Sequence, residues 1–291
     1  MARPFGQSEE PADRSDPPRP LHPSTSSTSS TSSTSSTPSD PFDISHPCPR
    51  LCVIIPTYNE AENIGRLVEA IRQLGDPQRL WIVVVDDSSA DGTSDRVREM
   101  APRLGGVELI ERPVKLGLGT AYVAGLRRAF ELDAQYAVTM DADFSHDPEK
   151  IPELLDAIEK HHADLAIGSR YIPGGQTTHW GLHRKILSRS ANWLAHVILD
   201  LRSRDCTSGF RCYRLSFLRA IDLDSIKTNG YSFLVEMLFA CQGRGASIVE
   251  IPIVFRNRDC GKSKISRAEI FKAIGTLWRL RRAKHSRPQN S

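Results

Sequence analysis

The chain has 291 residues, enough for one large domain or two small ones at roughly 150 residues per domain. Hydrophobic residues make up 39% and charged residues 25%, which is typical of a globular protein and excludes a collagen or a coiled coil. No apolar run approaches the roughly 18 residues of a membrane-spanning helix, and the N-terminus lacks the pattern of a signal peptide. We therefore expect a cytosolic protein rather than an integral membrane protein.

The formal net charge of +3 is unevenly distributed. Residues 256–287 contain eleven Lys or Arg against two acids, so the rest of the chain is acidic. A basic C-terminus favours an anionic partner such as phosphate, a membrane surface or nucleic acid. No basic patch interleaved with aromatic residues accompanies it, which disfavours nucleic acid. The six cysteines include no Cys-x-x-Cys pair, so we expect reduced thiols.

Composition divides the chain into three parts. Residues 24–37 are all Ser or Thr, and ten of the nineteen prolines lie before residue 50. Such a segment cannot bury enough apolar surface to offset its ordering entropy. We predict a disordered tail at 1–48, a single folded domain at 49–265, and a basic amphipathic helix with its tail at 266–291.

The folded part alternates short apolar runs with helical patterns, which predicts an α/β domain with a mostly parallel sheet flanked by helices. Strands are expected at 51–55, 81–85, 107–111, 136–140, 164–168 and 251–255. Helices are expected around Ile64 to Ile71, from near Leu118, and at 149–161. The pattern does not indicate the order of the strands in the sheet.

Acidic residues follow two of the expected strands, where open α/β sheets bind their ligands. Asp86 and Asp87 are adjacent, and like charges repel unless a donor or cation shares the site. A ribose hydroxyl or a nucleobase N–H could be that donor, and simple helix capping is the alternative.

Asp141 and Asp143 are spaced i and i+2 at the end of a strand, so both side chains can face one cation. Mg²⁺ or Mn²⁺ held by few carboxylates completes its shell with substrate phosphates. A solvated turn is the alternative for this tripeptide. His146 could join the site, although an exposed loop histidine is the commoner case. The glycines between Lys115 and Thr120 lack the spacing of a Walker or dinucleotide loop, so we expect them to allow close packing at a helix start.

Five sequence blocks occur in order along the chain. They are Pro56-Thr57-Tyr58-Asn59-Glu60, Asp86 to Thr93, Gly117 to Ala121, Met140 to Asp143, and Gly168 to Tyr171. Together they resemble glycosyltransferase family 2, most closely its dolichol-phosphate mannosyltransferases, over about residues 52–264. The resemblance implies a GT-A-like, Rossmann-type domain. It also implies an inverting transfer of mannose from GDP-mannose to a polyprenyl phosphate, giving the β-linked product.

The resemblance also implies roles for individual residues. The nucleobase and ribose pocket would be lined by Pro56, Tyr58, Glu60, Val85 and Asp87. The diphosphate and a catalytic Mg²⁺ or Mn²⁺ would be held by Asp141, Ala142 and Asp143, the two aspartates being metal ligands and Asp143 the direct one.

Basic residues would complete the site. Arg170 would contact the sugar or phosphates and would be a catalytic residue together with the two aspartates. Arg258 and Lys264 would close over the diphosphate. Some relatives carry Gln as a further metal ligand where this chain has Ser145, which leaves the coordination shell open. The Gln-x-x-Arg-Trp block of polysaccharide synthases is missing, so such a synthase is not expected.

Two further residues are candidates for handling the acceptor. Arg211 could bind its phosphate, with a surface ion pair as the alternative. Glu236, an acid among apolar neighbours, could orient the acceptor or Arg170, with a structural salt bridge as the alternative. A polyprenyl phosphate is already anionic and needs no strong base, so positioning and electrostatics would supply the catalysis.

The C-terminal segment combines a Ser266–Glu269 capping box with an apolar face and many basic residues. That face is expected to hold Ile270, Phe271, Ile274, Leu277 and Trp278. It could lie on the cytoplasmic leaflet of a membrane, with a possible anchoring subunit, or pack on the body of the domain. Residues 183–201, with Arg184, Lys185, Arg189 and Trp193, offer a second such surface. Alternative functions are a glucosyltransferase that uses UDP-glucose and a non-catalytic protein that binds sugar nucleotides.

Overall fold

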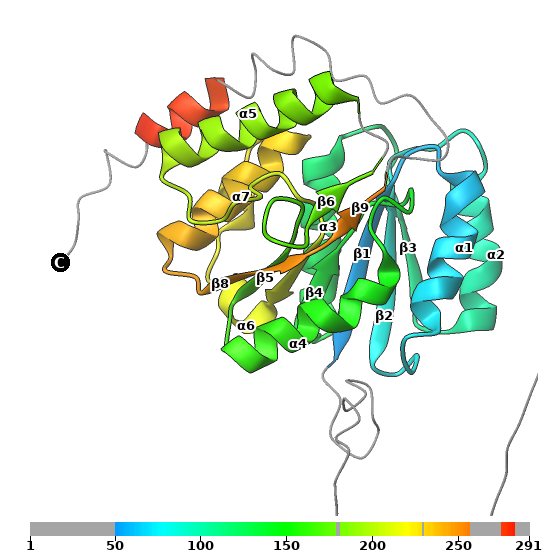
Figure 1. Ribbon diagram of the computed structural model, residues 1–291. Helices are drawn as coiled ribbons and strands as arrows, with labels where there is room; N and C mark the ends of the chain where they lie inside the picture. Colours follow the sequence, from blue (N-terminus) through cyan, green and yellow to red (C-terminus); the bar gives the residue numbers. More distant parts are fainter. Residues whose placement is uncertain (1–49, 179–180, 229, 257–274, 283–291) are drawn as a thin grey trace, which may run out of the picture. The chain divides into compact units, whose positions relative to one another are not determined.

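The computed structural model describes residues 50–178, 181–228, 230–256 and 275–282 (Figure 1). The chain divides into two units, Met1–Ser39 and Asp40–Ser291, and every described residue belongs to the second. The predicted tail at 1–48, and the predicted site residues Arg258 and Lys264, lie outside the described residues.

A seven-stranded sheet forms the centre of the domain, in the order β3-β2-β1-β4-β7-β5-β8. The strands are β1 (Leu51–Thr57), β2 (Leu80–Asp86), β3 (Val107–Glu111), β4 (Tyr136–Thr139), β5 (Leu165–Ser169), β7 (Arg211–Arg214) and β8 (Ile248–Pro252). β7 runs antiparallel to β4 and β5, and the other neighbouring pairs are parallel. The mostly parallel sheet and its first five strands are as predicted, whereas β7 was not expected.

The strand predicted at 251–255 is divided between two sheets. Its first part belongs to β8, and the chain leaves the large sheet at Ile253. β9 (Val254–Phe255) then pairs in parallel with β6 (Gln176–Thr177) to form a separate two-stranded sheet. The prediction of one continuous strand was therefore wrong.

Helices cover both faces of the sheet. The elements are α1 (Ala61–Arg72), α2 (Thr93–Leu104), α3 (Leu118–Glu131), α4 (Ile151–His161), α5 (Leu182–Leu199), α6 (Leu215–Leu218), α7 (Tyr231–Gly243) and two short 3-10 turns, η1 (Pro148–Lys150) and η2 (Leu223–Ser225). Buried residues of α1, α2 and α4 form one core, and those of α3, α5 and α7 form the other. The three predicted helices are confirmed, and none of the described helices is long and apolar enough to cross a membrane.

Burial on both faces explains why the central strands are continuous apolar runs. Along β1, Cys52 and Ile54 face one core, while Leu51, Val53 and Ile55 face the other. A strand covered on one side only would alternate apolar with polar residues, but a strand covered on both sides needs apolar residues at every position.

Glycines of α3 allow that helix to lie directly against its neighbours. A Cβ atom at Gly125 would come within 2.3 Å of Ile54 Cγ2 in β1, and one at Gly119 would come within 2.6 Å of the Thr228 carbonyl oxygen. Gly117, just before the helix, has a φ of 97°, which side chains rarely adopt. The expectation that glycine allows close packing at the start of this helix is confirmed at Gly119.

The strand order places a topological switch point beside β1, where open α/β sheets form the crevice that binds a ligand. The chain passes from β1 to β2 and β3 on one side, then returns to β4 on the other side of β1. At such a switch point the loops leaving neighbouring strands diverge, which opens a binding site at their carboxyl ends. The segments after β1, β2 and β4 meet at this end of the sheet.

We predict that Gly125→Ala lowers the free energy of unfolding by about 1–3 kcal/mol, because the added methyl group overlaps Ile54. Urea denaturation would measure the change. Gly243→Ala is the matched control, since a Cβ there meets no atom within 4 Å. Combining Gly125→Ala with Ile54→Ala should cost less than the sum of the two single changes. A Gly125→Ala protein as stable as wild type would contradict the close approach.

Candidate functional site

The backbone is strained where three strands end at the crevice. Asn59, Ser88 and Phe144, which follow β1, β2 and β4, have φ values of 57°, 63° and 57°. Residues other than glycine seldom adopt this left-handed conformation, and it tends to gather at ligand sites. Asn59 joins two of these loops, because its amide N–H donates to Ser89 Oγ and its Oδ1 accepts from the amide of Ala90.

Asp86 is a buried anchor for the loop after β2. Its carboxylate accepts hydrogen bonds from Thr57 Oγ1 (2.7 Å), the Ser89 amide (2.9 Å), Ser89 Oγ (2.6 Å) and Ser94 Oγ (2.9 Å). These four donors use the roughly four acceptor positions that a carboxylate offers. Asp86 therefore holds the loop before α2 in place. It does not cap that helix, because the N-cap residue is Gly92, which has no side-chain capping hydrogen bond.

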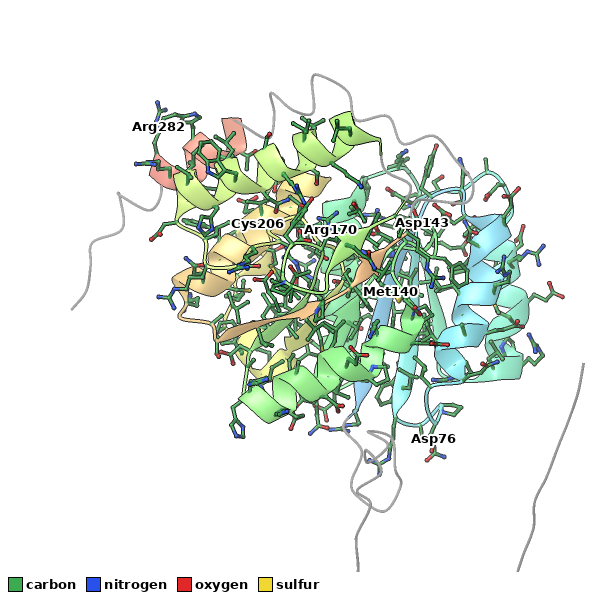
Figure 2. The ribbon with its side chains drawn as sticks, viewed as in Figure 1. Asp76, Met140, Asp143, Arg170, Cys206 and Arg282 are labelled. Carbon is green, nitrogen blue, oxygen red and sulfur yellow. The ribbon has the colours of Figure 1, made fainter. Side chains whose placement is uncertain are left out.

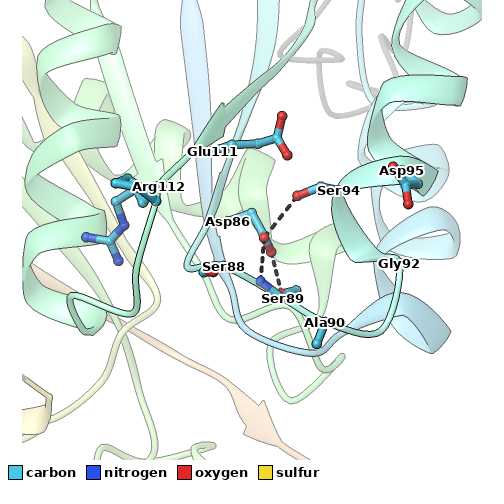
Figure 3. A pocket seen from close by; sticks show the side chains of 10 residues that line it. Asp86, Ser88, Ser89, Ala90, Gly92, Ser94, Asp95, Glu111 and Arg112 are labelled. Atoms are coloured by element: carbon cyan, nitrogen blue, oxygen red, sulfur yellow. Dashed lines mark hydrogen bonds between the residues drawn. The ribbon is translucent and has the colours of Figure 1, made fainter.

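A polar cavity of about 560 Å³ lies beside Asp86, at the carboxyl ends of β2 and β3 (Figure 3). Its lining includes Ser88, Asp95, Glu111 and Arg112. None of the five residues predicted for the nucleobase pocket lines it. The cavity therefore does not coincide with the residues predicted for the nucleobase pocket.

Asp87 pairs with the loop between β3 and α3. The Arg112 guanidinium lies 2.8 Å from its Oδ1, and the amides of Leu116 and Gly117 donate to it at 2.7 and 2.8 Å. Separate donors thus allow Asp86 and Asp87 to be adjacent. Three of the roughly four acceptor positions are occupied, which leaves about one for the predicted ribose or guanine contact.

The other residues predicted for the nucleobase pocket differ in accessibility. The Tyr58 ring is exposed, and Lys115 Nζ lies 3.3 Å from its centre. Pro56 and Glu60 are partly buried. The Val85 side chain is entirely buried in the core, so Val85 offers its backbone to a nucleobase.

Asp141 and Asp143 lie in the loop after β4. Figure 2 labels Asp143 in this loop. β4 ends at Thr139, so the expected placement of both acids on a strand end was wrong. Asp143 is buried, and its Oδ1 accepts from the Ser145 amide at 3.0 Å. The Asp141 side chain is partly exposed, and its Oδ1 accepts from the Tyr122 hydroxyl at 3.3 Å.

His146 is a buried support for this loop, not the exposed histidine that was the common alternative. Its ring stacks on Phe210 and meets Phe255 edge-on. Nδ1 accepts a hydrogen bond from the Asp141 amide at 3.0 Å, so the proton of the neutral ring lies on Nε2. Burial lowers the pKa of His146, although Asp141 and Asp143 act in the opposite direction.

The donor atoms near Asp141 and Asp143 suit a divalent metal that arrives with its substrate. Among the described residues, no group of three or more His, Cys, Asp or Glu side chains could hold a metal ion. Two carboxylates are nevertheless enough when phosphate oxygens and water complete an octahedral shell. Ser145 Oγ adds a buried oxygen that makes no hydrogen bond within the described part of the chain. The residues therefore fit Mg²⁺ or Mn²⁺ bound together with a diphosphate.

Arg170 is held by a buried carboxylate that the sequence analysis missed. Its Nε and Nη2 each donate to an oxygen of Asp205 at 2.7 Å, and Nη2 also donates to Thr207 Oγ1. Burial alone raises the pKa of Asp205, but the ion pair and hydrogen bonds from Arg170 outweigh this and lower the pKa. The guanidinium is therefore fixed in one orientation. Asp205 lies 35 residues from Arg170, and no local pattern marks the pair.

Helix α5 is tied to the loops that hold Arg170. Ser188 Oγ is 2.7 Å from the hydroxyl of Tyr171, the residue after Arg170. Asn192 Oδ1 accepts from the Cys206 amide at 2.8 Å, and Asn192 Nδ2 donates to Thr207 Oγ1 at 3.1 Å. In Figure 2, Arg170 and Cys206 lie beneath this helix. The inward face of α5 therefore supports the site.

Arg211 does not have the role predicted for it. Its side chain is completely buried, and its guanidinium donates to the carbonyl oxygens of Ser208 (2.8 Å), Leu234 (2.8 Å) and Cys206 (2.9 Å). Because its guanidinium is completely buried, Arg211 cannot reach an acceptor phosphate or form a surface ion pair. It instead fastens the loop that contains Asp205 to α7.

Glu236 forms a structural salt bridge, which was the alternative expectation for it. It accepts from the amide and hydroxyl of Thr228, and Arg279 Nη2 lies 3.0 Å from its Oε1. Arg279 belongs to the helical residues 275–282, which this pair joins to α7.

The helical residues 275–282 pack on the body of the domain through Leu277 and Leu280, while Trp278 is exposed. The prediction that Leu277 and Trp278 share one face was wrong. Ile270, Phe271 and Ile274 lie outside the described residues.

Comparison with known proteins gives matches over most of the chain. Residues 52–222 match the family description "Glycosyl transferase family 2". The undecaprenyl-phosphate mannosyltransferase of Micrococcus luteus is 42% identical over 234 residues, which cover 79% of this chain and 93% of that protein. The polyprenol monophosphomannose synthase of Mycolicibacterium smegmatis is 42% identical over 229 residues, which cover 78% and 85%.

A solved structure has a similar fold. Glucosyl-3-phosphoglycerate synthase from Mycobacterium tuberculosis, in complex with Mn²⁺, uridine diphosphate and glucosyl-3-phosphoglycerate, superposes with a TM-score of 0.59. The similarity covers 80% of each chain at 18% sequence identity. At this identity the likeness concerns the fold alone, and the fold is GT-A-like, as expected.

We predict that Asp205→Asn lowers the free energy of unfolding at pH 7 by about 3–5 kcal/mol, because it leaves the buried guanidinium of Arg170 without its carboxylate. The pKa of Asp205 is lowered by folding, so its contribution is complete above the unfolded value of about 3.9. This contribution to stability is lost as the pH falls through the lower pKa that Asp205 has in the folded state. The difference in free energy of unfolding between Asp205→Asn and the wild type should therefore be equal at pH 7 and pH 5. It should become smaller below about pH 4.

Urea denaturation at several pH values would measure this difference. Asp133→Asn is the control, because Asp133 pairs with Arg50 at an exposed site and should contribute less than about 1 kcal/mol. A loss of no more than the control at pH 7 would show that the pair with Arg170 does not stabilise the fold.

Proposed function

Because this chain belongs to glycosyltransferase family 2, we propose that it transfers mannose from GDP-mannose to a polyprenyl phosphate. The reaction inverts the anomeric carbon and gives β-linked polyprenyl phosphate mannose and GDP. The observation that supports this most strongly is 42% identity, over nearly four fifths of the chain, to two proteins named for joining mannose to undecaprenyl or polyprenyl phosphate. Each match also covers most of the relative's own length.

The donor nucleotide would bind in the crevice beside β1. Pro56 lies in β1, and Tyr58 and Glu60 follow it. Val85 lies near the end of β2, and Asp87 comes directly after that strand. The exposed Tyr58 ring offers a flat apolar surface to a nucleobase, and the remaining acceptor position of Asp87 suits a ribose hydroxyl or a guanine N–H.

The diphosphate would lie near Asp141, Ala142 and Asp143. The two aspartates would hold Mg²⁺ or Mn²⁺, with Asp143 as the direct ligand, and the structural relative holds Mn²⁺ together with its nucleotide. When bound, the metal neutralises charge that develops on the departing diphosphate. The structure supports this assignment through the carboxylate donors and the buried oxygen of Ser145.

Arg170 would contribute a positive charge in a fixed orientation. The paired Asp205 and the contact with Thr207 hold its guanidinium before substrate binds, so little reorganisation accompanies the reaction. The acceptor phosphate is already anionic, and its oxygen can attack the anomeric carbon from the side opposite the leaving GDP without a strong base. Arg258 and Lys264 would close over the diphosphate, and both lie outside the described residues.

The reaction would take place on the cytoplasmic face of a membrane, where the acceptor's hydrocarbon chain remains in the bilayer. The protein would associate with this surface peripherally, alone or with an anchoring subunit. The basic residues of the C-terminal segment, with Trp278, favour contact with anionic lipid. Nucleic acid is not proposed as a partner.

UDP-glucose is a second candidate donor, because the structural relative holds uridine diphosphate and a glucosyl product. Purified protein would be incubated with Mg²⁺, a polyprenyl phosphate and either radiolabelled GDP-mannose or radiolabelled UDP-glucose. We expect mannose label, and little glucose label, in the lipid phase. If only glucose label entered the lipid phase, the transferred sugar would be glucose and the donor UDP-glucose. Binding of sugar nucleotide with no label transferred would favour a non-catalytic binding protein.

We predict that Asp143→Ala lowers the rate of mannose transfer about 100-fold or more while the fold is retained, because it removes the proposed metal ligand. Circular dichroism would monitor the fold, and paramagnetic resonance would follow Mn²⁺ binding in the presence of GDP. Asp133→Asn, at an exposed site, should change neither the transfer rate nor the binding of Mn²⁺. Near-normal turnover of Asp143→Ala in the presence of EDTA would remove the metal from the proposal.

A further inference from the structure

One side of α5 is apolar and faces away from the protein. Leu182, Ile186, Trp193 and Val197 are 73, 57, 65 and 52% exposed. Their spacing of four, seven and four residues places them along one side of a helix with 3.6 residues per turn. Isolated exposed apolar residues are common on globular proteins, but a row that includes a tryptophan indicates a contact surface.

Basic residues border this apolar row, and acids are absent from the helix. Arg189 is exposed and lies three residues after Ile186 and four before Trp193. Lys185 is partly exposed one turn earlier. The 18 residues of α5 contain no Asp or Glu. The charge of this helix therefore complements an anionic surface.

The helical residues 275–282, beside the end of α5, also combine an exposed tryptophan with basic residues. Arg281 Nη1 donates to the carbonyl oxygen of Ile198 at 3.3 Å, and Figure 1 shows this helix (red) next to α5. Leu277 and Leu280 are buried, whereas Trp278 is 53% exposed and Arg282 lies at the outer end of the helix (Figure 2). Two tryptophans, one from each helix, are thus exposed on neighbouring helices.

The opposite face of α5 contacts the proposed reaction site. Ser188 and Asn192 point inward to Tyr171, Cys206 and Thr207, which surround Arg170. One helix, about 10 Å across, therefore separates the exposed apolar row from the loops that hold Arg170.

We propose that the protein docks on an anionic lipid bilayer through the α5 surface, formed by Leu182, Ile186, Arg189, Trp193, Val197 and Trp278. This inference rests on the proposed function, since a polyprenyl phosphate keeps its chain in lipid. Tryptophan rings favour the boundary between headgroups and hydrocarbon, and basic side chains are attracted to an anionic leaflet. Docking in this way places Arg170 at the level where the acceptor phosphate lies.

Sedimentation of the full-length protein with vesicles tests the surface without any enzymatic assay. Vesicles of phosphatidylcholine with phosphatidylglycerol should bind the wild type more strongly than phosphatidylcholine alone, and salt should weaken the binding. The double variant Ile186→Gln/Trp193→Gln should bind roughly tenfold more weakly, because both positions lose apolar contact with lipid. Arg189→Glu should weaken binding to anionic vesicles roughly fivefold to tenfold.

A matched control distinguishes the effect of the α5 surface on vesicle binding from the effect of the protein's net charge. Lys160→Glu reverses a charge at an exposed position of α4, away from α5, and should bind vesicles like the wild type. The proposal is overturned if the α5 variants sediment like the wild type, or if the wild type does not bind protein-free vesicles, which would point to a protein partner on this surface. Equal weakening by Lys160→Glu and Arg189→Glu would overturn the assignment of Arg189.

Activity measurements then distinguish failure of the docking surface from failure of the proposed function. With a short-chain polyprenyl phosphate in detergent, the α5 variants should transfer mannose at the wild-type rate. With a long-chain acceptor in vesicles, the rate should fall in parallel with vesicle binding. A wild-type protein that transfers mannose to neither acceptor would overturn the proposed function, and the sedimentation results would still decide whether α5 docks on lipid.

Discussion

Mutual repulsion of carboxylates is the constraint around which the site is organised. Two pairs of aspartates stand at the end of β2 and in the loop after β4, on either side of β1. Asp86 and Asp87 can be adjacent because each has its own donors. Those of Asp86 come from β1, the loop after β2 and the start of α2, and those of Asp87 come from the segment between β3 and α3. Asp141 and Asp143, in the loop after β4, offer carboxylate oxygens that suit a divalent cation arriving with its substrate.

The charge of Arg170 is likewise balanced by a buried partner from a distant part of the chain. Its charge is balanced by Asp205, and the loop that contains Asp205 is fastened by the buried Arg211 and by Asn192 of α5. These contacts connect the outer helix, the sheet and the proposed site through a small set of buried polar groups. Unpaired polar groups are costly in such surroundings, so a change at one member should disturb its neighbours.

The sequence predicts the elements that depend on local pattern, and misses those that depend on distant contacts. Strands buried on both faces read as apolar runs, and the acidic blocks mark the carboxyl end of the sheet. β7 was not predicted because its Arg211 is charged. The burial of Arg211 becomes favourable only through hydrogen bonds to carbonyl groups, including that of the distant Leu234. The partner of Arg170 was missed for the same reason.

The position of β5 in the sheet has a consequence for synthesis of the chain. β5 pairs only with β7 and β8, both of which come later in the sequence, whereas β1 to β4 can pair as they emerge. At roughly 5–20 residues per second, a ribosome needs about two to nine seconds to extend the chain from the end of β5 to the end of β7. During that interval β5 has unpaired edges and apolar side chains exposed. The nascent chain is then most open to aggregation and to chaperones.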